Sequence, residues 1–187
     1  MKTLKSTIVM WAVVLVSGAV AQAQQDQPYF HAGWKMLGAQ AFQGQQHAQD
    51  RAQQLYYYNQ IPKTSPKSKN DAKDITAGIK KDLAAANRAL ESLRAEVAKD
   101  KEIEAARNKV VVALIESITK HNANAHEACG AAEEACMKHE GESPAVADCC
   151  SDMYDELEAA KEDTTKLLKL LKIEKLERPT KAAPATK

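Results

Sequence analysis

Apolar residues recur every three or four positions through four long segments of this chain, and this spacing constrains the fold more than any other feature. It places the apolar side chains on one side of an α-helix. No segment alternates apolar and polar residues as a half-buried strand does. The 6 prolines lie at or outside the segment ends. The sequence therefore predicts an all-α chain, with helices at about residues 30–59, 69–98, 100–139 and 144–176.

The first segment has an apolar row with a small centre, which would let a neighbouring helix approach closely. Its other faces are rich in glutamine, and the regular row favours a solvated helix face over a low-complexity tract. We therefore expect the glutamines to face solvent. They are Gln40, Gln43, Gln45, Gln46, Gln49, Gln53 and Gln54.

The apolar rows of the second and third segments face different directions around the helix axis, and this difference indicates that one helix ends and another begins between them. Successive helical residues turn by about 100°, so the row of the second segment points roughly 70° away from that of the third. We expect a tight turn at Ala98–Asp100, with Asp100 as the N-cap of the third helix. The alternative is one fused helix in a long hairpin that dimerises. In the third segment the expected row is Ile103, Val110, Val111, Leu114, Ile118, His121, Ala125, Cys129, Ala132 and Cys136.

The fourth helix has clear signals at its start. Gly141 ends the third helix, Ser143 is a natural N-cap, and Pro144 suits the first helical position. Its apolar row runs from Val146 to Leu171. Short connections between long helices imply antiparallel neighbours, so the expected architecture is an antiparallel up-down four-helix bundle.

The N-terminus reads as an export signal. Lys2 and Lys5 precede the apolar run Thr7–Val16, and Ala21-Gln22-Ala23 has small residues at the positions a signal peptidase reads. A membrane anchor needs about 20 apolar residues, so we expect a cleavable signal peptide at 1–23, cut after Ala23, and a periplasmic or secreted product.

The mature chain would then comprise one bundle domain at 24–176 and a disordered tail at 177–187. Its formal net charge, +1 for the full sequence, falls to about −1 when two lysines leave with the signal peptide. This balance argues against nucleic acid as the partner. We also expect no membrane span in the mature chain, because no later segment is apolar enough.

All four cysteines lie in a short stretch on either side of Gly141, and export favours disulfides between them. The least strained nested pairing is Cys136–Cys149 with Cys129–Cys150, of which the second would carry the strain. Cys129 lies about 10.5 Å from Cys136 along a helix, whereas Cys149 and Cys150 are adjacent. A reducible vicinal Cys149–Cys150 pair is a further possibility.

The alternative interpretation of the cluster is a soft-metal site for copper or zinc, since these ions select thiolate, imidazole and thioether ligands. No C-x-x-C or H-x-x-x-H spacing supports it. The first candidate ligand set is Cys136, His139, Cys149 and Cys150. The second set is Cys129, His126 and Met153.

No catalytic motif is present, so the sequence predicts a non-enzymatic protein that needs no cofactor. The expected role is structural or interactive, through a protein partner or self-association, with a cysteine-stapled helical hairpin. The alternative is a periplasmic metal-binding module. Three consecutive tyrosines, Tyr56–Tyr58, should lie at the cysteine end of the bundle, with one ring packed and two exposed.

Overall fold

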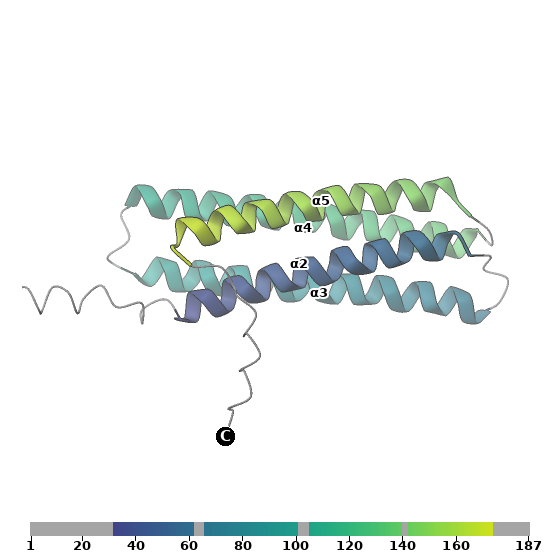
Figure 1. Ribbon diagram of the computed structural model, residues 1–187, viewed down its shortest axis with the longest axis horizontal. Helices are drawn as coiled ribbons and strands as arrows, with labels where there is room; N and C mark the ends of the chain where they lie inside the picture. Colours follow the sequence, from purple (N-terminus) through teal and green to yellow (C-terminus); the bar gives the residue numbers. More distant parts are fainter. Residues whose placement is uncertain (1–31, 62–65, 101–104, 140–141, 174–187) are drawn as a thin grey trace, which may run out of the picture. The chain divides into compact units, whose positions relative to one another are not determined.

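The computed structural model confirms an all-α fold with four long helices and no strand in its described residues (Figure 1). The described residues are 32–61, 66–100, 105–139 and 142–173. The helices are α2 (Ala32–Asn59), α3 (Pro66–Lys99), α4 (Ala105–Lys138) and α5 (Pro144–Leu170). The predicted signal peptide and the predicted tail lie outside the described residues.

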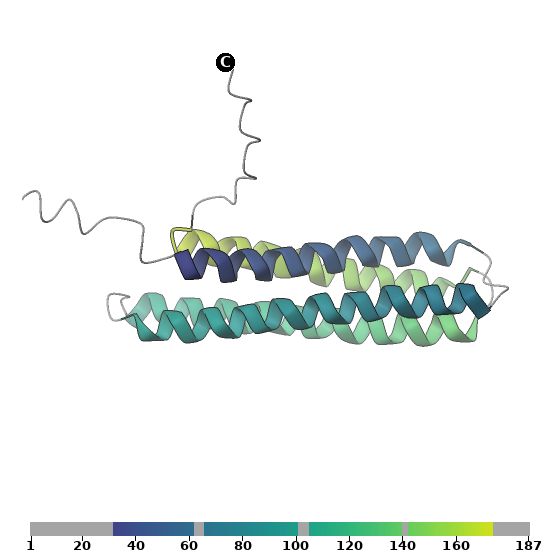
Figure 2. The same cartoon turned by 90° about the horizontal axis from the view of Figure 1, so that it is seen from below.

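Contacts between the helices confirm the antiparallel up-down arrangement. Figures 1 and 2 show consecutive helices running in opposite directions side by side. Where two of these contacts join the same pair of helices, residue numbers rise on one helix and fall on the other, as antiparallel neighbours require. The contacts are Arg51–Asp82 between α2 and α3, Lys80–Glu133 and Arg94–Glu116 between α3 and α4, Ser117–Asp163 and His121–Glu156 between α4 and α5, and Gln49–Glu158 between α2 and α5.

The boundary between α3 and α4 is partly as expected. α3 ends at Lys99 and Asp100 is not helical, so the two helices are separate and the fused alternative is excluded. α4 is described from Ala105 and residues 101–104 lie outside the described residues, so Asp100 as the N-cap of this helix stays a prediction. The amide of Asp100 donates to the carbonyl of Val97 (3.2 Å), which closes the last turn of α3.

The start of α5 is tied to the end of α2. Ser143 occupies the N-cap position with extended backbone and Pro144 the first turn, as predicted, although the Ser143 side chain makes no capping hydrogen bond. The buried side chain of Asn59 forms two hydrogen bonds with the backbone of Ser143. Its Nδ2 donates to the Ser143 carbonyl (3.0 Å), and its Oδ1 accepts from the Ser143 amide (3.2 Å). These two bonds join α2 to α5 at the end of the bundle where the cysteines lie. We call this end, where α2 leads into α3 and α4 leads into α5, the loop end.

The prediction that the last helix reaches residue 176 is wrong, because α5 ends at Leu170. Lys172 adopts a left-handed conformation with φ 54°. The amide of Ile173 donates to the carbonyl of Leu168 (2.9 Å), and that of Lys172 to Lys169 (3.0 Å). These bonds form a Schellman motif, which satisfies the last carbonyls and turns the chain.

The core consists of two hydrophobic clusters, one at each end of the bundle. The loop-end cluster comprises Ala48, Ala52, Leu55, Ala72, Ile75, Ile79, Leu83, Ala125, Cys129, Ala132, Cys136, Val146, Cys150, Met153 and Leu157. The far-end cluster comprises Trp34, Ala41, Ala89, Leu90, Leu93, Val97, Val111, Ile115, Ile118, Ala160, Leu167, Leu171 and Ile173.

Between the clusters lies a chain of hydrogen bonds to which each helix contributes one side chain. Thr164 of α5 donates to Oε1 of Gln45 on α2 (2.9 Å). Gln45 Nε2 donates to Oδ1 of Asn122 on α4 (3.5 Å), and Asn122 Nδ2 donates to Oδ1 of Asn87 on α3 (2.7 Å). Gln45, Asn122 and Thr164 are all 0 % exposed. We call these four residues the polar layer.

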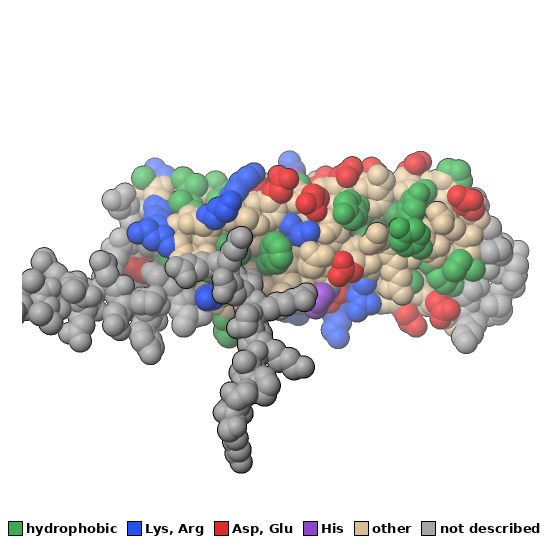
Figure 3. Space-filling model, viewed as in Figure 1, with side chains coloured by type: hydrophobic (Ala, Val, Ile, Leu, Met, Phe, Trp, Pro, Cys, Tyr) green, Lys and Arg blue, Asp and Glu red, His purple; other side chains and the backbone are tan. Residues whose placement is uncertain are grey.

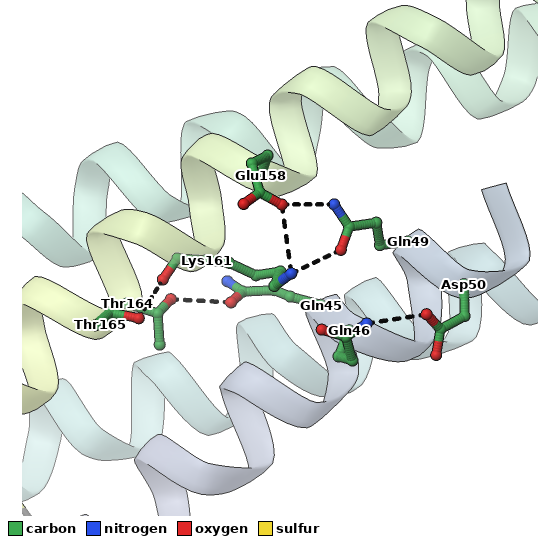
Figure 4. A network of polar contacts seen from close by, with 8 residues as sticks. All are labelled: Gln45, Gln46, Gln49, Asp50, Glu158, Lys161, Thr164 and Thr165. Atoms are coloured by element: carbon green, nitrogen blue, oxygen red, sulfur yellow. Dashed lines mark hydrogen bonds and ion pairs between the residues drawn. The ribbon is translucent and has the colours of Figure 1, made fainter. Parts of the chain in front are cut away.

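The expectation that the glutamines of α2 face solvent is therefore wrong for Gln45 and Gln49, which are buried. Gln49 lies between α2 and α5. Its Nε2 donates to Glu158 (2.7 Å), and its Oε1 accepts from Lys161 (2.7 Å), as Figure 4 shows. The narrow alanine row of α2 leaves room beside it, and amides with partners fill that room at little cost.

The buried row of α4 also differs from the expected one. Buried Ile115 and Asn122 were not in the expected row, whereas expected Val110 is half exposed, and expected Leu114 and His121 are only partly buried. Ile103 lies outside the described residues. An asparagine scores as polar in the sequence pattern, but its amide is paired here on two sides.

The second predicted segment has its apolar row buried throughout in α3, at Ile75, Ile79, Leu83, Ala86, Leu90, Leu93 and Val97. The row of α5 is buried from Val146 to Leu171, except that Leu168, which its spacing also predicts to be buried, is partly buried.

The close approach of α2 and α3 depends on Gly44. A Cβ atom there would lie 2.8 Å from the backbone oxygen of Asp82, whereas one at Gly130 would meet nothing within 4 Å. We expect Gly44→Ala to lower the free energy of unfolding by about 1–3 kcal/mol through overpacking. The control Gly130→Ala should raise it by about 0.5–1 kcal/mol through helix propensity. Urea denaturation followed by circular dichroism measures both, and equal effects would contradict this account.

Candidate functional site

The predicted cysteine cluster is present at the loop end. Cys129, Cys136 and Cys150 are buried in the loop-end cluster, and half-buried Cys149 packs against it. The described residues include all four cysteines and contain no disulfide. The structure thus brings the thiols to one end of the bundle, while the pairing itself stays a prediction.

Contacts between α4 and α5 show which of their residues lie level with each other. Asn124 donates to Glu156 (3.1 Å), and Ser117 donates to Asp163 (2.8 Å). Both pairs define the same antiparallel register. Extended towards the loop end, this register places Cys129 level with residue 151 and Cys136 level with residue 144.

This register treats the two predicted disulfides differently. Cys150 is one residue from the level of Cys129, whereas Cys149 is five residues, about 7.5 Å, from the level of Cys136. Because a disulfide joins Cα atoms at most about 7 Å apart, the register favours Cys129–Cys150. The strain was expected in this pair instead, because Cys129 and Cys136 lie about 10.5 Å apart along their helix, whereas Cys149 and Cys150 are adjacent.

The candidate metal ligands lie on different sides of their helices. Met153 is buried with the thiols in the loop-end cluster, whereas His126 and His139 are exposed. In the described part of the chain, no three His, Cys, Asp or Glu side chains are grouped so that they could hold a metal ion. The structure thus gathers the sulfur ligands of both predicted sets and separates the imidazoles from them.

Two of the thiols are in surroundings that disfavour the thiolate. Burial raises the pKa of Cys129 to about 11, against a smaller opposing effect of Lys80. Its Sγ donates to the backbone oxygen of Thr76 on α3 (3.6 Å). Burial also raises the pKa of Cys149, and the nearby Asp152 and Asp148 raise it further. The thiolate is the form that attacks or binds metal, so both side chains are poorly reactive at neutral pH.

A groove of about 590 Å³ lies between α4 and α5, and Cys149 is on its wall. Sequence reasoning missed it, because its two walls come from different helices. Alanines line it at Ala128, Ala131 and Ala159, where small side chains leave space between the helices. The other lining residues are polar, namely His121, Asn124, Glu127, Asp152, Asp155 and Glu156.

One carboxylate of the groove is held by partners, while the others are not. His121 Nδ1 lies 2.6 Å from Glu156, which also accepts from Asn124. Burial alone would raise the pKa of Glu156, but these two hydrogen bonds outweigh it and lower the pKa. Within the described part of the chain, no hydrogen bond or ion pair holds the other carboxylates that line the groove, Glu127 of α4 and Asp152 and Asp155 of α5.

Exposed tyrosines are the second surface feature of the loop end. Tyr56 and Tyr57 pack edge to face with ring centroids 5.8 Å apart, and Tyr57 is 57 % exposed. Tyr58 is partly buried against the loop-end cluster. This confirms the expectation of one packed and two exposed rings. On α5, Tyr154 is 44 % exposed, and Figure 3 shows hydrophobic side chains on this end of the α2–α5 face.

Comparisons with protein-family models, curated proteins and solved structures found no match to this chain. Among the described helices, none is both long and apolar enough to cross a membrane.

The thiol environments predict an order of reactivity in the reduced, folded protein. At pH 8 a thiol with a pKa near 11 is about one part in a thousand thiolate, so iodoacetamide should modify half-exposed Cys149 first and Cys129 at least about a hundredfold more slowly than an ordinary thiol. Peptide mass spectrometry measures the order. In denaturant the four rates should become similar. Equal rates at Cys149 and Cys129 in the folded protein would contradict the burial described.

Proposed function

We propose that this chain is an exported, non-enzymatic helical-bundle protein that acts by binding a protein partner on its surface. The N-terminal sequence pattern supports export. An exported compartment is oxidising, and the shared location of the thiols supports a disulfide that staples α4 to α5, with Cys129–Cys150 as the better placed pair.

The observation that carries the interaction role is the position of the exposed apolar side chains. Among the described residues six large hydrophobic side chains are exposed, and four of them lie around the loop end. These four are Tyr56, Tyr57, Ile61 and Tyr154. Tyrosine is enriched in protein–protein interfaces, because its ring buries a large area and its hydroxyl still forms hydrogen bonds.

The interior supports the same conclusion. Two hydrophobic clusters and the polar layer occupy the space between the helices, and the members of the polar layer bond to one another. The groove between α4 and α5 opens at the surface of the bundle. A ligand therefore has its best access at the outer faces of the bundle.

The alternative is a periplasmic copper or zinc module. It rests on the sulfur atoms of Cys129, Cys136, Cys150 and Met153, which share the loop-end cluster. These are the ligand types that copper(I) prefers. The exposed positions of His126 and His139 weaken this alternative, because the imidazoles would have to come from another face.

One experiment separates the two functions. The mature protein is purified from an oxidising compartment, its mass is measured, its thiols are counted in denaturant, and bound copper and zinc are measured by elemental analysis. We expect a chain that begins at Gln24, fewer reactive thiols than cysteines, and no stoichiometric metal. Stoichiometric metal with reduced cysteines would contradict the interaction protein and support the metal module.

The interaction itself is tested by a photo-cross-linking residue at position 57, with the same residue at Met36 as a control. Met36 is equally exposed, but it lies on the part of α2 that contributes to the far-end cluster. Irradiation of exporting cells should give adducts of discrete mass from position 57 and not from position 36. If neither position gives a specific adduct, the interaction role is wrong.

A further inference from the structure

The outer face of α5 near the loop end carries a concentrated negative charge. Between residues 142 and 160 the sequence contains no lysine or arginine. Its acidic residues on α5 are Asp148, Asp152, Asp155, Glu156 and Glu158. Figure 3 shows acidic side chains along this part of α5 and basic ones towards its other end. Glu127 of α4 adds a further carboxylate on the opposite wall of the groove.

Most of this charge is not neutralised within the described part of the bundle. Glu156 is held by His121, and Glu158 by Lys161 and Gln49. No ion pair among the described residues reaches Asp148, Asp152 or Asp155. The raised pKa of Cys149, to which both Asp148 and Asp152 contribute after burial, reflects the same local field. Carboxylates grouped in this way repel each other unless a cation lies between them.

The groove beside these carboxylates suits one kind of side chain. Ala128, Ala131 and Ala159 give the groove small apolar walls, which can cover the methylene stem of a lysine or an arginine. The carboxylates that line the same groove can pair with the guanidinium or ammonium group at the end of that stem.

We propose that this face of α5, from Asp155 and Asp152 across the groove to Glu127 of α4, is the docking surface for a basic segment of the partner protein. We call it the acidic face. The proposal rests on the proposed interaction function and names the chemistry of the partner, a segment in which arginine or lysine recurs. A second copy of this chain is a poorer match, because Lys161 and Lys166 on its own α5 already pair with Glu158 and Asp163.

The test uses the mature protein and two fluorescent synthetic peptides, one of alternating arginine and alanine and one with glutamine in place of arginine. Fluorescence anisotropy measures both affinities. We expect the arginine peptide to bind and to weaken as salt is added, and the glutamine peptide not to bind. Asp152→Asn with Asp155→Asn should weaken binding about tenfold, since each exposed ion pair is worth up to about 1 kcal/mol.

The matched control is Asp74→Asn with Glu91→Gln, which removes two exposed carboxylates from α3. It should leave the affinity nearly unchanged. Circular dichroism melting curves check that all variants are folded.

Three results would overturn the proposal. One is no binding of the arginine peptide; a second is equal weakening by both pairs of substitutions, which would indicate diffuse attraction. The third is a concentration-dependent dimer in sedimentation that the Asp152 and Asp155 substitutions abolish, which would assign the face to a second copy. If one of these results is found but cross-linked adducts still form at position 57, the chain binds a protein partner that is not basic. If no such adducts form either, the proposed interaction function is also wrong.

Discussion

The hydrogen bonds that link Thr164, Gln45, Asn122 and Asn87 connect all four helices in the interior of the bundle, and the alignment of the helices depends on them. Three of these side chains are fully buried. A buried polar group without a partner costs about 1–3 kcal/mol. If one helix slid by a turn, the polar groups would face aliphatic side chains of the two clusters, and several of them would lose their partners at once. The hydrophobic clusters favour association of the helices, but they discriminate less between registers, because leucine, isoleucine and alanine fit one another in several ways.

The surface features of the loop end follow from this register. Asn59 can bond to the Ser143 backbone only if the end of α2 lies beside the start of α5. The carboxylates and alanines that α4 and α5 contribute line one groove for the same reason. The acidic face and the exposed tyrosines are therefore displayed by a rigid frame whose alignment is set at the polar layer.

The sequence predicts those parts of the fold that depend on one helix at a time. The apolar rows of α3 and α5, and the start of α5 at Ser143 and Pro144, could be identified because periodicity and capping residues are local signals. The buried amides of Gln45, Gln49 and Asn122 could not, because an amide is acceptable in a core only when a partner on another helix meets it. The end of α5 was missed because its left-handed residue is Lys172 and not a glycine.

The candidate site follows the same rule. The gathering of thiols at the loop end and the exposure of two of three tyrosines could be predicted from spacing along single helices. The acidic groove could not, because neither Glu127 nor Asp152 is unusual on its own helix. The run without lysine or arginine at the start of α5 is the one signal that would have pointed to it.

Distance measurement between α2 and α5 tests the central role of the polar layer most directly. Genetically encoded spin labels are placed at Gln53 and Glu162, both exposed, in the wild-type chain and in a variant with Gln45→Leu, Asn122→Leu and Thr164→Val. Pulsed electron paramagnetic resonance should give one narrow distance for the wild type. In the variant, which is expected to be no less stable, additional distances should appear as helices slide by a turn of about 5.4 Å. A single, unchanged distance in the variant would show that the hydrophobic clusters alone set the register and would contradict this account.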